Sequence, residues 1–257
     1  MPRRARNRSS TGVYHVIVRG VNRQEIFRDN EDRRKYLFIL KNVKLIDPYK
    51  LLGYCLMSNH VHLLMQEGEN NIGRVMKRIG VAYVQWYNRK HGRVGHLFQD
   101  RYKSEEVEDD TYLLTVLRYI HQNPVKAKIV NSINDYKWSS FKNYLGEKSY
   151  PLDLVDTELI FDLLDIRDEV SIERFNAYMS EPNTDKCLDD EEQKDLPDKE
   201  VEMIIEAMLN IVPATSIKNM DQKKRNEALR KIKSMDGITI RQISRITGIG
   251  RYIINKA

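Results

Sequence analysis

The strongest constraint on the fold is the change of hydrophobic period along residues 11–126. Segments with apolar residues at every second position, typical of strands, alternate with segments in which they recur every three or four positions, typical of amphipathic helices. We expect strands over residues 11–21, 50–57, 59–66 and 101–107, and helices over 29–44, 70–90 and from 109 or 110 to 124. This order (strand, helix, strand, strand, helix, strand, helix) predicts an α+β domain of the split βαβ, ferredoxin-like kind.

Capping residues and a proline set the expected ends of these helices. Asp29, and either Asp109 or Asp110, can accept hydrogen bonds from the first backbone N–H groups of a helix. Pro124 is expected to stop the last helix, because proline has no backbone N–H and the residue before it avoids helical geometry.

The last 36 residues or so predict a small all-α domain of the helix-turn-helix kind, with short helices over about 222–235, 239–246 and 250–256. Gly248 suits the tight turn between the last two helices. Four isoleucines are expected to form a miniature core: Ile243, Ile246, Ile249 and Ile253. The side chains expected to face a DNA groove are Arg251, Tyr252, Asn255 and Lys256. A helical bundle that contacts another protein is the alternative interpretation.

Charge divides the chain into three regions, which we take as its domain organisation. Residues 1–150 hold 27 Lys and Arg against 15 Asp and Glu, residues 151–200 hold 5 against 17, and residues 201–257 hold 11 against 5. We therefore expect a first domain over 1–150, a helical extension with an acidic linker (181–200) over 151–200, and a DNA-binding domain over 201–257. Basic surfaces attract polyanions, although charge alone does not choose between DNA, RNA and acidic proteins.

The remaining bulk features exclude several classes of protein. The two cysteines, Cys55 and Cys187, suggest neither a disulfide framework nor a cysteine zinc site. No apolar run approaches the length that spans a bilayer, and none follows the basic N-terminus as a secretory signal would require. We expect a soluble, cytoplasmic protein without a membrane partner.

A pair of histidines, His60 and His62, lies in the predicted strand 59–66. Because side chains alternate along a strand, both imidazoles are expected on one face, about 7 Å apart, while Val61, Leu63 and Met65 face an apolar core. Such a pair can share a divalent cation if a third polar group arrives from elsewhere. The alternative is two hydrogen-bonding histidines on a half-exposed strand.

A second pair, Tyr119 and Asn123, lies four residues apart and therefore on one face of the last predicted helix of the first domain. An amide oxygen is a suitable ligand for Mg²⁺ or Mn²⁺, and a phenol nearby could attack a phosphodiester held there. For this pair alone a packed core tyrosine and a helix-terminal asparagine are the favoured interpretation, because such spacing is common.

Several sequence blocks taken together favour the catalytic interpretation of Tyr119 and Asn123 over the packed one. The chain resembles the HUH superfamily of single-strand nucleases, and within it the REP-associated tyrosine transposases of the IS200-like group, over roughly residues 10–146. The resemblance rests on YHVIVRGVNRQEIF (14–27), CLMSNHVHLL (55–64), NRKHGRVGHLFQDRYKS (88–104), RYIHQNPVKA (118–127) and YKWSSFKNY (136–144). Ser58, Gln122 and Lys128 depart from the residues common in the family, and none of them is a proposed catalytic group.

The resemblance implies a role for each site residue and makes residues 1–150 an HUH catalytic domain. His60, His62 and Asn123 would bind a divalent metal ion, Mg or Mn, and Tyr119 would be the nucleophile. The reaction implied is DNA transesterification through a 5′-phosphotyrosine, which needs no nucleotide cofactor. The substrate implied is single-stranded DNA beside a hairpin.

Further DNA contacts are expected around this site and in the C-terminal domain. His15 and Arg19 share one face of the first strand and could bind phosphate, although surface residues without such a role are an equal alternative. Arg4 and Arg6 belong to a basic arm that could follow the DNA backbone. Arg101 and Lys103 lie in a segment that mixes aromatic and basic residues, and Arg251 and Tyr252 complete the expected set.

Two other functions stay open from the sequence. One is a domesticated DNA-binding regulator that keeps the fold without transposition, and the other is a nuclease that uses water while Tyr119 is only packed. The sequence also leaves open whether the chain works as a monomer or a homodimer, and whether Tyr119 acts beside its own histidines or a partner's.

Overall fold

The computed structural model describes residues 7–147, 149–185, 187–188, 196–235, 238 and 240–257, and the chain forms two compact units, Met1–Asp190 and Glu191–Ala257. Each unit is described by itself below. Arg4 and Arg6, which we expected to contact DNA, lie outside the described residues. Among the described helices, none combines the length and the apolar character that a membrane span requires.

The first unit is built on a four-stranded antiparallel sheet. Its strands are β1 (Val13–Arg19), β2 (Tyr49–Leu56), β3 (His60–Glu67) and β4 (Lys103–Glu106), in the order β2-β3-β1-β4. Helix α1 (Asn30–Ile46) lies between β1 and β2 in the chain, α2 (Ile72–Lys90) lies between β3 and β4, and α3 (Asp110–Lys126) follows β4, in the order that the alternating periods predicted. The α+β fold of the split βαβ kind is therefore confirmed.

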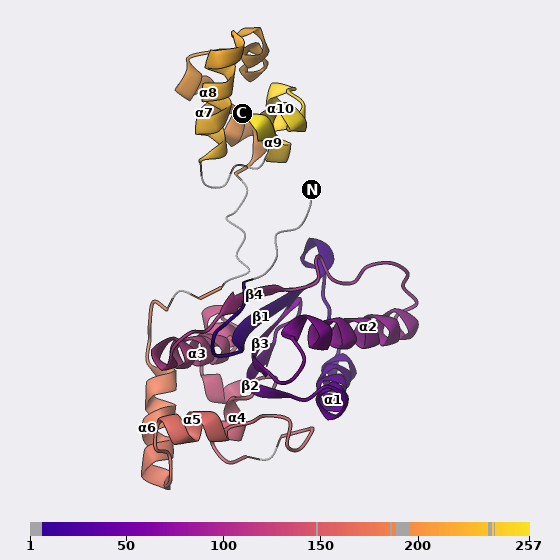
Figure 1. The fold of residues 1–257 in the computed structure, drawn as a ribbon, viewed down its shortest axis with the longest axis vertical. Coiled ribbons are helices and arrows are strands. Elements are labelled where there is room, and N and C mark those ends of the chain that lie inside the picture. Colours follow the sequence, from indigo (N-terminus) through magenta and orange to yellow (C-terminus); the bar gives the residue numbers. More distant parts are fainter. Residues whose placement is uncertain (1–6, 148, 186, 189–195, 236–237, 239) are drawn as a thin grey trace. The chain divides into compact units, whose positions relative to one another are not determined.

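Helices cover both faces of the sheet (Figure 1). On one face α1 and α2 bury a core that includes Val61, Leu63 and Met65, as the strand pattern predicted. On the other face α3 packs over Leu64 and Cys55 in a second core. At the histidines this face is covered as well: His62 is fully buried, whereas the alternative interpretation placed the pair on a half-exposed strand.

Three shorter helices add to the second core: α4 (Phe141–Tyr144), α5 (Glu158–Leu163) and α6 (Glu169–Ser180). The helical extension expected before residue 180 is thus present on α3. Part of the predicted linker 181–200 is also held there, because Arg118 on α3 forms a two-bond ion pair with Asp185, at 2.8 and 3.0 Å. The short 3₁₀ helices of this unit are η1 (Val21–Arg23) and η2 (Ile133–Asp135).

The helix starts follow their capping residues, but the predicted stop at Pro124 is wrong. Asp29 caps α1 and Asp109 caps α3, each by accepting a backbone N–H of the first turn. Helix α3 continues through Pro124 to Lys126, and the amide of Ala127 still donates to the Asn123 carbonyl at 2.9 Å. The proline removes its own N–H only, and packing of α3 on the sheet outweighs that loss.

The second unit is helical, with α7 (Asp198–Leu209), η3 (Ala214–Asn219), α8 (Gln222–Lys233), α9 (Ile240–Thr247) and α10 (Arg251–Lys256). The three expected helices correspond to α8, α9 and α10, whereas α7 begins inside the predicted acidic linker. Gly248 has φ +66°, which suits the turn before α10. Within the core the prediction of Ile253 is wrong: its side chain is 42% exposed, and the neighbouring Ile254 is buried instead.

Candidate functional site

The register of the sheet brings most of the predicted site residues to the face that α3 covers. Residues directly opposite each other in an antiparallel pair point to the same side of the sheet. Arg19 lies opposite His60, Ile17 opposite His62, and His15 opposite both Leu64 on β3 and Glu105 on β4. The polar side chains that share this face therefore include His15, Arg19, His60, His62, Lys103 and Glu105.

His62 is fully buried and uses one ring nitrogen inside the protein. Its Nδ1 lies 3.0 Å from His15 Nε2, while its Nε2 is buried without a hydrogen-bond partner among the described residues. Burial, followed by the proximity of His15, His60 and Arg19, holds the pKa of His62 well below its ordinary value. The ring is therefore neutral near pH 7, as an imidazole that binds a metal ion must be.

His60 is half-buried beside His62, and the two ring centroids lie 5.0 Å apart. Its Nδ1 lies 2.6 Å from the side-chain oxygen of Asn59, whose amide nitrogen in turn donates to the carbonyl of Arg23. An amide oxygen only accepts, so Nδ1 of His60 carries the hydrogen and Nε2 keeps its lone pair. Both histidines thus use Nδ1 in contacts within the protein.

The turn that precedes His60 is fixed by the loop after β1. The carbonyl of Ser58 accepts hydrogen bonds from the backbone N–H groups of Ile26 and Phe27, at 2.9 and 3.1 Å. The hydroxyl of Tyr83 on α2 holds that loop by donating to the Ile26 carbonyl at 2.6 Å. The position of His60 therefore depends on contacts with the α2 side of the sheet as well as on its own strand.

Tyr119 on α3 faces the imidazoles. Its ring centroid lies 5.8 Å from that of His62 and 6.0 Å from that of His15, edge-on in both cases. The side chain is 5% exposed, and Lys126, one of the exposed residues of α3, places Nζ 4.8 Å from the ring centroid. The buried phenol ring thus lies beside the histidines rather than away from them. The Lys126 ammonium group next to the ring could attract a phosphate.

Asn123 lies one helical turn beyond Tyr119 and is half-buried. Its amide nitrogen donates to the Tyr119 carbonyl at 3.0 Å, so the side-chain oxygen is the atom that could ligate a metal ion. Among the described residues, no three His, Cys, Asp or Glu side chains are arranged to hold a metal ion. A complete site therefore needs a ligand of another type, and an asparagine oxygen fits beside two imidazole Nε2 atoms.

His15 does not lie where a DNA phosphate could reach it, which corrects the interpretation of this residue as a direct contact. It is fully buried between His62 and Glu105, whose Oε2 is 3.7 Å from His15 Nδ1. Burial raises the pKa of Glu105, but contacts with His15 and with the N–H of Leu188 outweigh it and lower that pKa below its ordinary value.

The other predicted DNA contacts differ in exposure and in the unit that carries them. Arg19 is half-buried opposite His60, and Arg101 and Lys103 are exposed. Arg251 and Tyr252 are exposed on α10 of the second unit, where Tyr252 is 70% exposed.

Two residues of the site, Asn59 and Glu105, were missed in the sequence. Asn59 is next to His60 in the sequence, so its contact with that imidazole could have been predicted. Glu105 reaches His15 only through the pairing of β1 with β4, which the sequence alone does not reveal.

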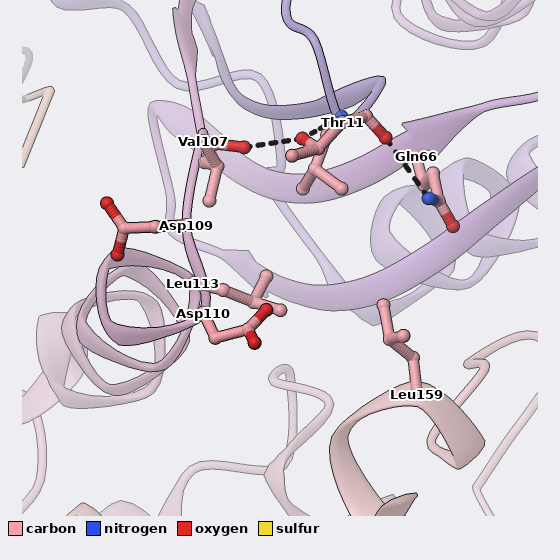
Figure 2. A pocket seen from close by; sticks show the side chains of 8 residues that line it. Thr11, Gln66, Val107, Asp109, Asp110, Leu113 and Leu159 are labelled. Atoms are coloured by element: carbon pink, nitrogen blue, oxygen red, sulfur yellow. Dashed lines mark hydrogen bonds between the residues drawn. The ribbon is translucent and has the colours of Figure 1, made fainter. Parts of the chain in front are cut away.

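A pocket of about 130 Å³ lies near the start of α3, and no histidine lines it (Figure 2). Thr11 links two of its walls by donating to the Val107 carbonyl at 2.5 Å and accepting from Gln66 through its own carbonyl at 3.2 Å. Asp109 and Asp110 add carboxylates to a lining that is otherwise largely apolar. None of the proposed metal or nucleophile residues lines it, so we do not assign it to the site.

Comparisons with known proteins give a family, a curated protein and a solved structure that resemble this chain. Residues 8–123 match the family described as "Transposase IS200 like". A curated protein of Haemophilus influenzae, described as a REP-associated tyrosine transposase, is 29% identical over 120 residues, which cover 41% of this chain and 66% of that protein. A solved structure described as a REP-associated tyrosine transposase bound to a REP hairpin is 19% identical, with a TM-score of 0.48, over 61% of this chain and 93% of that chain.

Proposed function

We propose that this chain, whose residues 8–123 match the IS200-like transposase family, is a metal-dependent single-tyrosine enzyme that cuts and rejoins single-stranded DNA. One observation carries the proposal. The phenol ring of Tyr119 lies 5.8 Å from the ring of His62, a neutral imidazole whose buried Nε2 has no hydrogen-bond partner among the described residues. The proposed nucleophile and a proposed metal-binding nitrogen are thus neighbours.

His60, His62 and Asn123 would hold the Mg²⁺ or Mn²⁺ ion. When bound, such an ion neutralises charge on a phosphodiester and makes its phosphorus more electrophilic. The residues of the chain prepare this site in advance: Asn59 and His15 occupy Nδ1 of the two histidines, and α3 carries the amide oxygen. Such outer contacts orient the ligands and set which nitrogen is available.

Tyr119 would perform the transfer. Its hydroxyl loses a proton to solvent as the oxygen forms a bond to phosphorus, and the bond from phosphorus to the 3′ oxygen breaks. That oxygen takes up a proton and leaves as a free 3′-OH, while Tyr119 keeps the 5′-phosphate. Attack by a 3′-OH reverses the sequence and releases the tyrosine, so the phosphodiester energy is conserved and no nucleotide cofactor is needed. Lys126, with Nζ 4.8 Å from the centroid of the Tyr119 ring, adds a positive charge beside the attacked phosphate.

The proposed substrate is single-stranded DNA beside a hairpin, as the resemblance to REP-associated transposases implies. The strongly basic first 150 residues, with 27 Lys and Arg against 15 Asp and Glu, suit a polyanion. Arg19, Arg101 and Lys103 in the first unit, and Arg251 and Tyr252 on α10, are the proposed DNA contacts among the described residues. Arg4 and Arg6 remain proposed contacts of the N-terminal arm.

The test is a hairpin oligonucleotide labelled at its 3′ end and incubated with the protein and Mn²⁺ or Mg²⁺. We expect labelled protein that survives SDS, because the fragment on the 3′ side of the cut stays on Tyr119. The adduct should disappear in Tyr119→Phe and persist in Tyr178→Phe, a matched removal of a hydroxyl on α6. Binding without cleavage would instead support a DNA-binding regulator, and cleavage without an adduct would support hydrolysis by water.

A further inference from the structure

His15 is the buried titratable residue beside the proposed site that the reaction does not use. It is fully buried, and its two ring nitrogens face two different groups. Nε2 lies 3.0 Å from His62 Nδ1, and Nδ1 lies 3.7 Å from Glu105 Oε2. Glu105, directly opposite on β4, is itself held by the N–H of Leu188 at 2.8 Å. The three side chains form a row from a carboxylate to a proposed metal ligand.

The carboxylate sets the order of hydrogens along this row. A carboxylate attracts an N–H and repels a lone pair, so the hydrogen of neutral His15 belongs on Nδ1, toward Glu105. His15 Nε2 then accepts, and the hydrogen between the two rings belongs to His62 Nδ1. His62 is left with a bare lone pair on Nε2. The reverse order would place an N–H on a buried nitrogen that has no acceptor among the described residues.

We propose that His15, oriented by Glu105, is a positioning residue that holds His62 in the Nδ1–H tautomer and thereby presents Nε2 to the metal ion. The inference rests on the proposed function, in which His62 Nε2 binds the metal ion. A free histidine side chain in water prefers the hydrogen on Nε2, so the protein must supply the opposite preference. Outer-shell partners of this kind typically change metal affinity by about 10–100-fold.

Two measurements separate positioning from simple packing. Long-range ¹H–¹⁵N NMR of the labelled full-length chain reports which ring nitrogen of His62 carries the hydrogen without any metal, and a His62→Gln sample assigns its signals. Titration calorimetry with Mn²⁺ reports affinity. The variants are His15→Leu, which fills the space without an acceptor, and His15→Gln, whose amide oxygen can still accept from His62. His96→Gln removes an exposed histidine as the matched control.

We expect the wild type and His96→Gln to show Nδ1–H at His62. His15→Leu should move the hydrogen to Nε2 and weaken Mn²⁺ binding about 10–100-fold. His15→Gln should restore most of the affinity. Glu105→Ala, at a partly exposed position, should move the His62 hydrogen toward Nε2 and weaken Mn²⁺ binding to a smaller extent. This variant replaces His15→Leu as the test if His15→Leu does not fold.

The outcomes distinguish this inference from the function on which it rests. Nε2–H at His62 in the wild type, or unchanged Mn²⁺ affinity in His15→Leu and Glu105→Ala, overturns the positioning role alone. A wild-type protein that binds no Mn²⁺ overturns the proposed metal site itself.

Discussion

Replacement of Asp32 by asparagine tests whether a buried carboxylate network holds the first unit together. Asp32 on α1 is fully buried, and both of its oxygens accept hydrogen bonds. One oxygen accepts from the backbone N–H groups of Arg28 and Asp29, at 2.7 and 3.3 Å. The other faces Lys90 Nζ at 2.9 Å and His91 Nε2 at 3.0 Å. The carboxylate thus joins the start of α1 to the end of α2.

The expected cost follows from this geometry. An asparagine presents one oxygen and one NH₂ group, so its nitrogen must face one of the two donor pairs. At least two hydrogen bonds and the negative charge are lost together. Removal of one partner from a buried ion pair costs about 3–5 kcal/mol. Because Lys90 keeps its contacts with Asp29 and Glu31, we expect the lower end, about 3 kcal/mol. For a unit of this size that lowers Tm by roughly 6–12 °C.

Urea unfolding followed by tryptophan fluorescence measures this loss. The two tryptophans of the chain, Trp86 and Trp138, both lie in the first unit, so the signal reports its unfolding. Asp168→Asn, at the exposed N-cap of α6, is the matched control and should not change stability measurably, since asparagine caps helices as well as aspartate. An Asp32→Asn protein that unfolds within about 1 kcal/mol of the wild type would refute the reasoning.

Two further substitutions test packing in each unit. Gly53→Ala on β2 would place Cβ 2.8 Å from Leu117 Cδ1 on α3, so we expect a loss of about 1–3 kcal/mol in the same urea assay, and a neutral result would show that α3 can shift. Ile254→Ala should destabilise the second unit by about 2–5 kcal/mol in thermal melts followed by circular dichroism. Ile253→Ala, at a 42% exposed position, should cost much less, and the opposite order would contradict the assigned core.

Local patterns in the sequence were sufficient for most of the first unit. Strand alternation separated the two faces of β3, so the shared direction of His60 and His62 followed from their spacing alone. Helical spacing likewise placed Tyr119 and Asn123 on one face of α3. Side-chain direction depends only on the local period of a strand or helix, so these two predictions agree with the structure.

Relations that depend on pairing or on packing were not accessible in this way. His15 meets His62 only because β1 pairs with β3 in one register, and it meets Glu105 only because β4 pairs on the other edge of β1. Pro124 was expected to end α3, but packing on the sheet overrode that local preference. The helix α10 has six residues, too few for its period to decide between adjacent isoleucines.

The central claim is that Tyr119 itself becomes linked to DNA, and mass spectrometry of the trapped adduct tests it most directly. Trypsin should release residues 119–126 (YIHQNPVK) as one peptide, with a single tyrosine as the candidate for a phosphodiester link. After reaction with a hairpin oligonucleotide and nuclease trimming, we predict the added nucleotide mass on this peptide, attached to Tyr119. A strand that is cut while the mass appears on another peptide, or on none, would contradict the account.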